Sequence, residues 1–164
     1  MEIILDGIGF FGPIILFISS LSKLMFLPAY LYGYLSLSVV NLLINRWLKI
    51  TIQEQRPQGS RSFIGEQYER TEEFGMPSHH SQSVFFSLVF NYLARPNKFE
   101  FVMELFVCIL TVLQRYKYKN HNWKQLIAGS VLGAMVAWIG ASFIKSQLEL
   151  DWKKGEKIDP IPAN

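Results

Sequence analysis

The sequence predicts an all-α protein, a polytopic membrane helical bundle of about five transmembrane helices. Half of its 164 residues are hydrophobic, aromatic residues are plentiful (13 Phe, 7 Tyr and 4 Trp), and charged residues make up only 18%. The apolar residues fall into five runs that are separated by polar segments, and the mean hydropathy is positive though modest, +0.19. This pattern is typical of a membrane protein with several spans, and the length predicts one domain.

The remaining composition excludes several classes of protein. The net charge of +3 is small and the basic residues are scattered, so nucleic-acid binding is not indicated. The single cysteine, Cys108, lies within an apolar run and excludes an intrachain disulfide. Residues 1–6 carry acids in place of the basic start of a secretory signal, so we expect no cleavable signal peptide.

The first two apolar runs differ in quality. Residues 7–22 are uncharged but slightly fewer than the roughly 17–25 that span a bilayer, which makes this run the weakest candidate. Residues 24–47 predict a span, and Pro28 lies in the first turn, where proline is tolerated. Asn41 and Asn45 are one turn apart, and we expect them to face other helices.

The other three runs complete the bundle. Residues 78–94 predict a third span, and residues 99–114 a short fourth span with Glu100 and Glu104 near its start. Residues 125–144 contain no charge and predict the fifth span most clearly. Small residues recur every four positions along it, a pattern that lets another helix approach closely: Gly129, Gly133, Ala137 and Ala141.

Polar segments connect the runs and end the chain. Residues 49–76 form the longest one, which cannot lie unpaired in hydrocarbon and is therefore expected at an interface. It contains an acid-rich piece with Glu66, Glu69, Glu72 and Glu73. Residues 115–124 form a second, basic and aromatic loop. We expect residues 1–145 to form the membrane domain and residues 146–164 to form a polar, disordered tail.

Five spans place consecutive helix ends on alternating sides of the membrane. The second span ends and the third begins on one side, and the fourth ends and the fifth begins on that same side. The topology therefore predicts that one face gathers three cations, a hydroxyl and three histidines: Lys49, Arg56, Arg115, Ser78, His79, His80 and His121.

These residue types suit phosphoryl chemistry. Pro77 and Ser78 begin a helix, whose unpaired first-turn N–H groups and dipole attract anions. Arginine presents a planar fork that matches phosphate oxygens, and lysine adds a compact charge. Of two separated histidines, one can attack phosphorus while the other protonates the leaving oxygen. No Asp, Glu or Cys cluster has metal-ligand spacing, so a route without a metal or other cofactor is favoured.

Each piece alone has a simpler interpretation. Lys49, Arg56 and Arg61 are typical interfacial anchors beside a span. The Pro-Ser-His-His cluster at residues 77–80 could be an ordinary helix cap with incidental histidines. The basic residues of 115–124 could set topology, and His121 could lie on the surface. The combined spacing of all these groups favours a site over these separate roles.

That spacing resembles the signature of the type-2 phosphatidic acid phosphatase superfamily, which reads K-x6-R-P, then P-S-G-H, then S-R-x5-H-x3-D. The three parts stand here as Lys49-x6-Arg56-Pro57, Pro77-Ser78-His79-His80 and Arg115-x5-His121-x3-Gln125. The resemblance covers about residues 24–145. The residues at 49–57, 75–82 and 121–125 are most similar to those of the dolichyl-diphosphatase branch, which removes a phosphate from a polyprenyl diphosphate.

The resemblance implies a role for each matched residue. Lys49, Arg56 and Arg115 would hold the phosphate, together with Ser78 and the adjoining amides, that of His79 included. His80 would be the general acid. His121 would be the nucleophile that becomes phosphohistidine, and Gln125 would orient it.

Three positions depart from the family pattern. His79 replaces a glycine but keeps the backbone N–H. Gln114 replaces a serine, which removes one possible phosphate contact. Gln125 replaces the aspartate that usually orients the nucleophile, and it lies one helical turn from His121, within reach of its side chain. Its carbonyl can accept from the imidazole but carries no charge, so a weaker nucleophile is expected.

We therefore expect a membrane-embedded phosphatase that converts a polyprenyl diphosphate to the monophosphate without a metal. The alternatives are a phosphatase of phosphatidate or related lipid monophosphates, and a catalytically silent membrane scaffold. Vanadate-dependent haloperoxidases share the site residues but are soluble, which the apolar runs argue against. The resemblance places a eukaryotic protein of this kind in the endoplasmic reticulum with a luminal site. The lipid chain length, the orientation of the bundle and the oligomeric state do not follow from the sequence.

Overall fold

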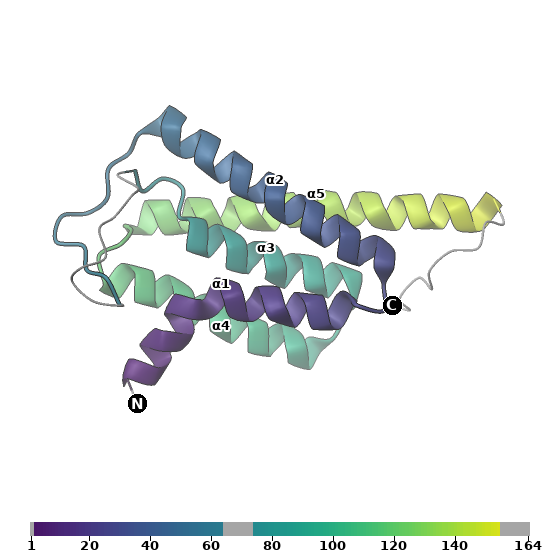
Figure 1. Ribbon diagram of the computed structural model, residues 1–164, viewed down its shortest axis with the longest axis horizontal. Helices are drawn as coiled ribbons and strands as arrows, with labels where there is room; N and C mark the ends of the chain where they lie inside the picture. The colour runs from purple at the N-terminus through teal and green to yellow at the C-terminus, as the bar shows by residue number, and fades with distance from the viewer. Residues whose placement is uncertain (1, 64–73, 155–164) are drawn as a thin grey trace.

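Five α-helices make up the described part of the chain, residues 2–63 and 74–154 of a computed structural model (Figure 1). The predicted all-α fold class is confirmed for these residues. The acid-rich piece with Glu66, Glu69, Glu72 and Glu73 lies outside them. The helices are α1 (Glu2–Leu24), α2 (Pro28–Ile52), α3 (His79–Ala94), α4 (Lys98–Lys117) and α5 (Trp123–Lys154).

Among the described helices, α1, α2 and α5 are each long and apolar enough to cross a membrane. The first run, the weakest candidate by length, lies in a helix that is long enough to span, because α1 has 23 residues and begins at Glu2. Its acids are compatible with a membrane helix end, since Lys117 of α4 lies 2.7 Å from both Glu2 and Asp6. The bundle is completed by α3, with 16 residues, and by α4, which carries Glu100 and Glu104.

The fifth helix is longer than predicted. It continues past Ile144 to Lys154, so residues 146–154, which the sequence assigns to a disordered tail, are helical. Leu148 gives this extension a buried anchor, because it is only 5% exposed and belongs to the main hydrophobic core. Residues 155–164 lie outside the described part of the chain.

The small-residue pattern of α5 packs against α3, as predicted. Gly129, Gly133, Ala137 and Ala141 are all buried. A Cβ atom on Gly129 would collide with the carbonyl oxygen of Ser78, and one on Gly133 would collide with that of Gln82. The two backbones therefore touch, and the contact begins at the first residues of α3.

The asparagines of α2 also face another helix, as predicted. Asn45 Nδ2 donates to Gln82 Oε1 over 2.6 Å and to the carbonyl oxygen of Pro77 over 3.2 Å. Gln82 Nε2 in turn donates to Asn41 Oδ1 over 2.7 Å. Buried amides in an apolar bundle need such partners, and here they hold the start of α3 against α2.

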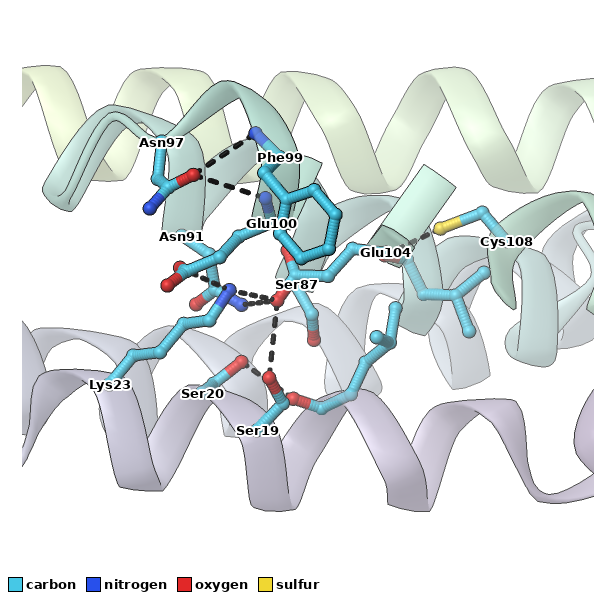
Figure 2. A network of polar contacts seen from close by, with 12 residues as sticks. Ser19, Ser20, Lys23, Ser87, Asn91, Asn97, Phe99, Glu100, Glu104 and Cys108 are labelled. Carbon is cyan, nitrogen blue, oxygen red and sulfur yellow. Dashed lines mark hydrogen bonds and ion pairs between the residues drawn. The ribbon is translucent and has the colours of Figure 1, made fainter. Parts of the chain in front are cut away.

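A second polar network ties α1, α3 and α4 together near the Asn97 end of the bundle (Figure 2). Lys23 Nζ lies 2.6 Å from Glu104 Oε1 and 2.9 Å from Glu100 Oε2. Asn91 Nδ2 donates to the same Glu104 oxygen over 2.9 Å. Glu104 is 5% exposed, and a charge buried in a membrane bundle requires such compensation. The two acids of the fourth apolar run are thus explained by a lysine from the first.

Candidate active site

The ends of α2, α3, α4 and α5 gather at one end of the bundle, on the left in Figure 1. The loop after α2 meets the loop before α5 there. Arg56 Nη1 donates to the carbonyl oxygen of Asn120 over 3.1 Å and lies 3.2 Å from His121 Nε2. The predicted convergence of these ends is confirmed, and His121, 3% exposed, is buried and not a surface residue.

The imidazole of His121 is held in one orientation by Gln125. Gln125 Nε2 donates to Glu54 Oε1 and to the carbonyl oxygen of Gln55, both over 2.9 Å. Its Oε1 therefore faces the other way, where it accepts from the N–H of Asn122 over 3.3 Å and lies 3.2 Å from His121 Nδ1. Because that oxygen can only accept, Nδ1 must be the protonated ring nitrogen. The lone pair is left on Nε2, beside Arg56.

Glu54 is a site residue that the sequence reasoning missed. Besides Gln125, its Oε1 accepts from Asn122 Nδ2 over 3.0 Å, and its carbonyl oxygen accepts from the N–H of Gly75 over 2.8 Å. The family has a carboxylate at position 125, in direct contact with the imidazole. Here the carboxylate of Glu54 contacts Gln125, which in turn contacts the imidazole. The only signal was its position inside the Lys49-x6-Arg56 motif, where the spacer residues were not assigned a function.

His121 is neutral under ordinary conditions. Burial lowers its pKa from the usual value to about 2, and the positive charges of Arg56 and Lys49 act in the same direction. The hydrogen bond with Gln125 opposes this shift only in part. The Nε2 lone pair accepts from Arg56, so the neutral imidazole can act as a nucleophile once a phosphate engages that guanidinium.

A second histidine–arginine pair lies at the junction of α3 and α4. Arg115 Nη2 is 2.8 Å from His80 Nε2. The guanidinium of Arg115 also lies over the ring of Phe10 from α1, 4.9 Å from its centroid, and this ring is 6.1 Å from that of His80. Phe10 is the second residue that sequence reasoning missed, because no motif connects α1 with this site.

The remaining predicted residues are Ser78, Lys49 and His79. Ser78 is fully buried as the N-cap of α3, and its N–H donates to the carbonyl oxygen of Gln125 over 3.0 Å. Lys49 is buried near the end of α2, close enough to His121 to lower its pKa. The side chain of His79 turns along α3 instead, where its Nε2 lies 3.3 Å from the hydroxyl of Ser83.

Position 114 does not reach the phosphate-binding groups. Gln114 is 2% exposed and packs against Gly9 of α1. Within the described residues neither its amide oxygen nor its nitrogen has a hydrogen-bond partner. The side chain that replaces the family's serine thus belongs to the contact between α1 and α4.

The geometry places two imidazoles beside two different guanidinium groups, and His80 lies in the first turn of α3. Such an arrangement can hold a phosphoryl group between a nucleophile and a proton donor. Over the ranges 2–63 and 74–154, no three His, Cys, Asp or Glu side chains cluster in a way that would hold a metal ion.

Comparison with known proteins gives the family. No curated protein and no solved structure matches the chain. The model of the PAP2 superfamily matches residues 29–148, which include every residue of the three motifs. The match covers well over half of the sequence and contains α3 and α4 entirely. The chain belongs to the PAP2 superfamily.

Proposed function

We propose that this protein removes the terminal phosphate from a polyprenyl diphosphate of the dolichyl type and releases the lipid monophosphate. Membership of the PAP2 superfamily implies phosphatase activity on lipid-type substrates. The observation that carries the finer assignment is the neutral Gln125 at 3.2 Å from His121 Nδ1, in the place of the usual aspartate.

The substrate's terminal phosphate is held by positive charge and by backbone donors. Arg56 and Arg115 each direct a guanidinium nitrogen at a histidine ring nitrogen, so a phosphate between the histidines meets both forks. Lys49 adds charge from the end of α2. The hydroxyl of Ser78 and the first-turn N–H groups of α3, including that of His79, complete the cradle.

The reaction proceeds in two displacements. Nε2 of His121 attacks the terminal phosphorus, and the bond from phosphorus to the bridging oxygen breaks, so that the lipid monophosphate leaves. His80, which can take up a proton at Nε2 once the phosphate has drawn the Arg115 guanidinium away, gives that proton to the leaving oxygen. His80 then accepts a proton from a water molecule that attacks the phosphohistidine, which releases inorganic phosphate and regenerates His121.

The preference for a diphosphate follows from the leaving group. Hydrolysis of a diphosphate expels a lipid monophosphate, whereas hydrolysis of a monophosphate expels an alkoxide. The first is a much better leaving group. An enzyme that works on diphosphates therefore tolerates a histidine oriented by a neutral amide. The resemblance to the dolichyl-diphosphatase branch adds the expectation of an endoplasmic reticulum membrane and a luminal site in a eukaryotic cell.

One observation favours the runner-up, a phosphatase of phosphatidate. Glu54 Oε1 accepts from Gln125 Nε2 over 2.9 Å, so a carboxylate is connected to the imidazole through the amide of Gln125. If that charge were transmitted well, His121 would be activated as strongly as in a monophosphatase. The charge acts through a neutral amide, however, so we favour the diphosphate.

Phosphate release from a panel of purified lipids tests the proposal. The purified protein in detergent is given a polyprenyl diphosphate, the matching monophosphate and phosphatidate, each with and without excess EDTA. We expect a clear preference for the diphosphate and no loss with EDTA, because the phosphate is held by Lys and Arg. Equal rates on phosphatidate would establish the runner-up, and no release from any lipid would favour the silent scaffold. Complete loss in EDTA that magnesium restores would contradict the route without a metal.

A further inference from the structure

A groove of about 230 Å³ lies between α1, α2 and α3. It is larger than the engineered cavity of about 150 Å³ that binds benzene, so it has room for a segment of hydrocarbon chain. A larger cavity, beside Pro96, Lys98 and Lys145, lies away from the site, near the connection of α3 to α4. The groove is lined by Pro13, Ile14 and Phe17 of α1, Tyr34, Ser38 and Asn41 of α2, and Ser83, Phe86 and Ser87 of α3.

The groove is apolar, and its α1 wall is exposed. Ile14 is 56% exposed and Phe17 is 37% exposed, although both line it. In Figure 1, α1 and α2 meet at their connection and diverge toward the end of the bundle that holds the site. The exposed side chains of Ile14 and Phe17 therefore place the α1 wall of the groove on the outer surface of the bundle.

The polar groups in the lining have hydrogen-bond partners within the bundle. The hydroxyls of Tyr34 and Ser87 are 2.8 Å apart, and that of Ser38 donates to the carbonyl oxygen of Tyr34 over 2.7 Å. Asn41 accepts from Gln82 over 2.7 Å. With their hydrogen bonds satisfied, these side chains impose little penalty on a hydrocarbon chain that lies beside them.

The groove lies close to the candidate active site along α3, because Ser83 of its lining follows His80 by three residues, about one helical turn. Ser83 lines it and lies 3.3 Å from Nε2 of His79, one helical turn back along α3. One turn corresponds to about 5.4 Å of rise, so a chain that leaves a phosphate beside His80 reaches the groove within a few carbon atoms. Asn41, which also lines the groove, accepts from Gln82, the residue directly before Ser83.

From this proximity we propose that the groove binds the first part of the substrate's prenyl chain and so favours a long isoprenoid diphosphate over one too short to reach it. This inference rests on the proposed function. Its α1 wall lies before residue 29, where the match to the superfamily model begins, so this chain builds the lipid site partly from a helix outside the matched region.

Filling the groove tests the proposal by kinetics. Ile14→Trp fills it, whereas Ile139→Trp places the same substitution at a similarly exposed residue of α5, which is not part of the lining. We expect Ile14→Trp to raise the KM for a long polyprenyl diphosphate about tenfold more than that for isopentenyl diphosphate, because on the order of two methylene groups lose their buried contacts. Ile139→Trp should leave the ratio of the two KM values as in the wild type. An equal effect on both substrates, or an equal effect of both variants, would overturn the proposal.

A binding readout separates the groove from catalysis. The probe is a polyprenyl methylenediphosphonate, which is not hydrolysed, with a diazirine in its chain. We expect photolabelling of Ile14 or Phe17, identified by mass spectrometry, that unlabelled polyprenyl diphosphate displaces and Ile14→Trp reduces. If the probe labelled the groove of a protein that hydrolyses no lipid diphosphate, the groove would still be a prenyl-binding site, but the proposed function would be refuted. Label spread equally over α5, or label that the diphosphate does not displace, would show ordinary bilayer contact and overturn the proposal.

Discussion

The amide of Gln125 and the carboxylate of Glu54 are joined by a hydrogen bond of 2.9 Å, donated by Gln125 Nε2 to Glu54 Oε1. This bond fixes which end of the amide faces His121, and the amide oxygen in turn fixes the imidazole tautomer. The residue that replaces the family's aspartate is therefore positioned by a carboxylate from the loop after α2. Glu54 acts through Gln125, and we regard it as a positioning residue.

Substitutions along this connection should affect the rate in a graded way. A lost hydrogen bond at a buried group costs ~1–3 kcal/mol, which corresponds to roughly fivefold to 150-fold in rate. We expect Gln125→Ala to lower kcat/KM by about this amount on both lipid diphosphates and monophosphates. Glu54→Gln should have a smaller effect on kcat, with little effect on KM, because it only loosens the amide. Glu149→Gln, an exposed site on α5, serves as the control.

The variant Gln125→Asp restores the family's carboxylate. It should raise activity on lipid monophosphates more than on diphosphates, since the poorer leaving group benefits more from an activated histidine. Glu54→Gln combined with Gln125→Asp should be more active than Gln125→Asp alone, because two adjacent carboxylates repel each other. If Gln125→Asp changed both substrates by the same factor, the link between position 125 and the leaving group would be wrong.

The role of His80 should depend on the substrate. A general acid matters least when the leaving group is already good. We therefore expect His80→Ala to slow hydrolysis of an aryl phosphate or a diphosphate less than that of a simple alkyl phosphate, as measured by kcat on each. His79→Ala is the neighbouring control, because its ring turns toward Ser83 and away from this pair. Equal losses on all substrates would contradict the assignment of His80.

Phe10 should hold the guanidinium of Arg115 in place. Phe10 belongs to α1, which lies outside the superfamily match. The contact of a guanidinium with an aromatic face is worth ~0.5–2 kcal/mol. We expect Phe10→Leu to raise KM for the lipid diphosphate by about twofold to thirtyfold on this basis, with a smaller change in kcat. Phe143→Leu alters a 63% exposed phenylalanine of α5 and should change neither constant. In the background of Arg115→Lys the effect of Phe10→Leu should largely disappear, and its persistence would contradict the contact.

The buried network around Glu104 should determine stability and not chemistry. Lys23→Met leaves the carboxylate of Glu104 without its cation, and such a loss typically costs ~3–5 kcal/mol. We expect a strongly lowered thermal midpoint in detergent, which Lys23→Met combined with Glu104→Gln partly restores. Lys117→Met, which removes ion pairs of an exposed lysine with Glu2 and Asp6, should lower the midpoint far less. A Lys23→Met protein as stable as the wild type would contradict the network's role.

Much of the site was predictable because the helix order forces it together. Once five spans alternate across a membrane, Lys49, Arg56, Arg115 and His121 must share a face, and the hydrogen bonds from Arg56 confirm this. The small residues of α5 likewise predict a close backbone contact, because nothing larger fits beneath Ser78.

Other features depend on contacts that no local pattern encodes. The bond of Glu54 with Gln125 exists only because the loop after α2 folds against the start of α5, 71 residues further along. Phe10 reaches Arg115 only through the packing of α1 on α4. The same packing allows α1 to extend beyond the uncharged run to Glu2, since Glu2 and Asp6, which precede the run, are paired with Lys117.

The central claim is that His121 carries the phosphoryl group, and trapping the phosphoenzyme tests it most directly. The purified protein is mixed with a polyprenyl diphosphate radiolabelled in the terminal phosphate, quenched in alkali within a single turnover, and digested for peptide analysis. We expect label on the peptide that contains His121, stable in alkali and lost in acid, and no label with His121→Ala. Steady release of phosphate by a wild type that never acquires label, or label that persists in His121→Ala, would contradict the account.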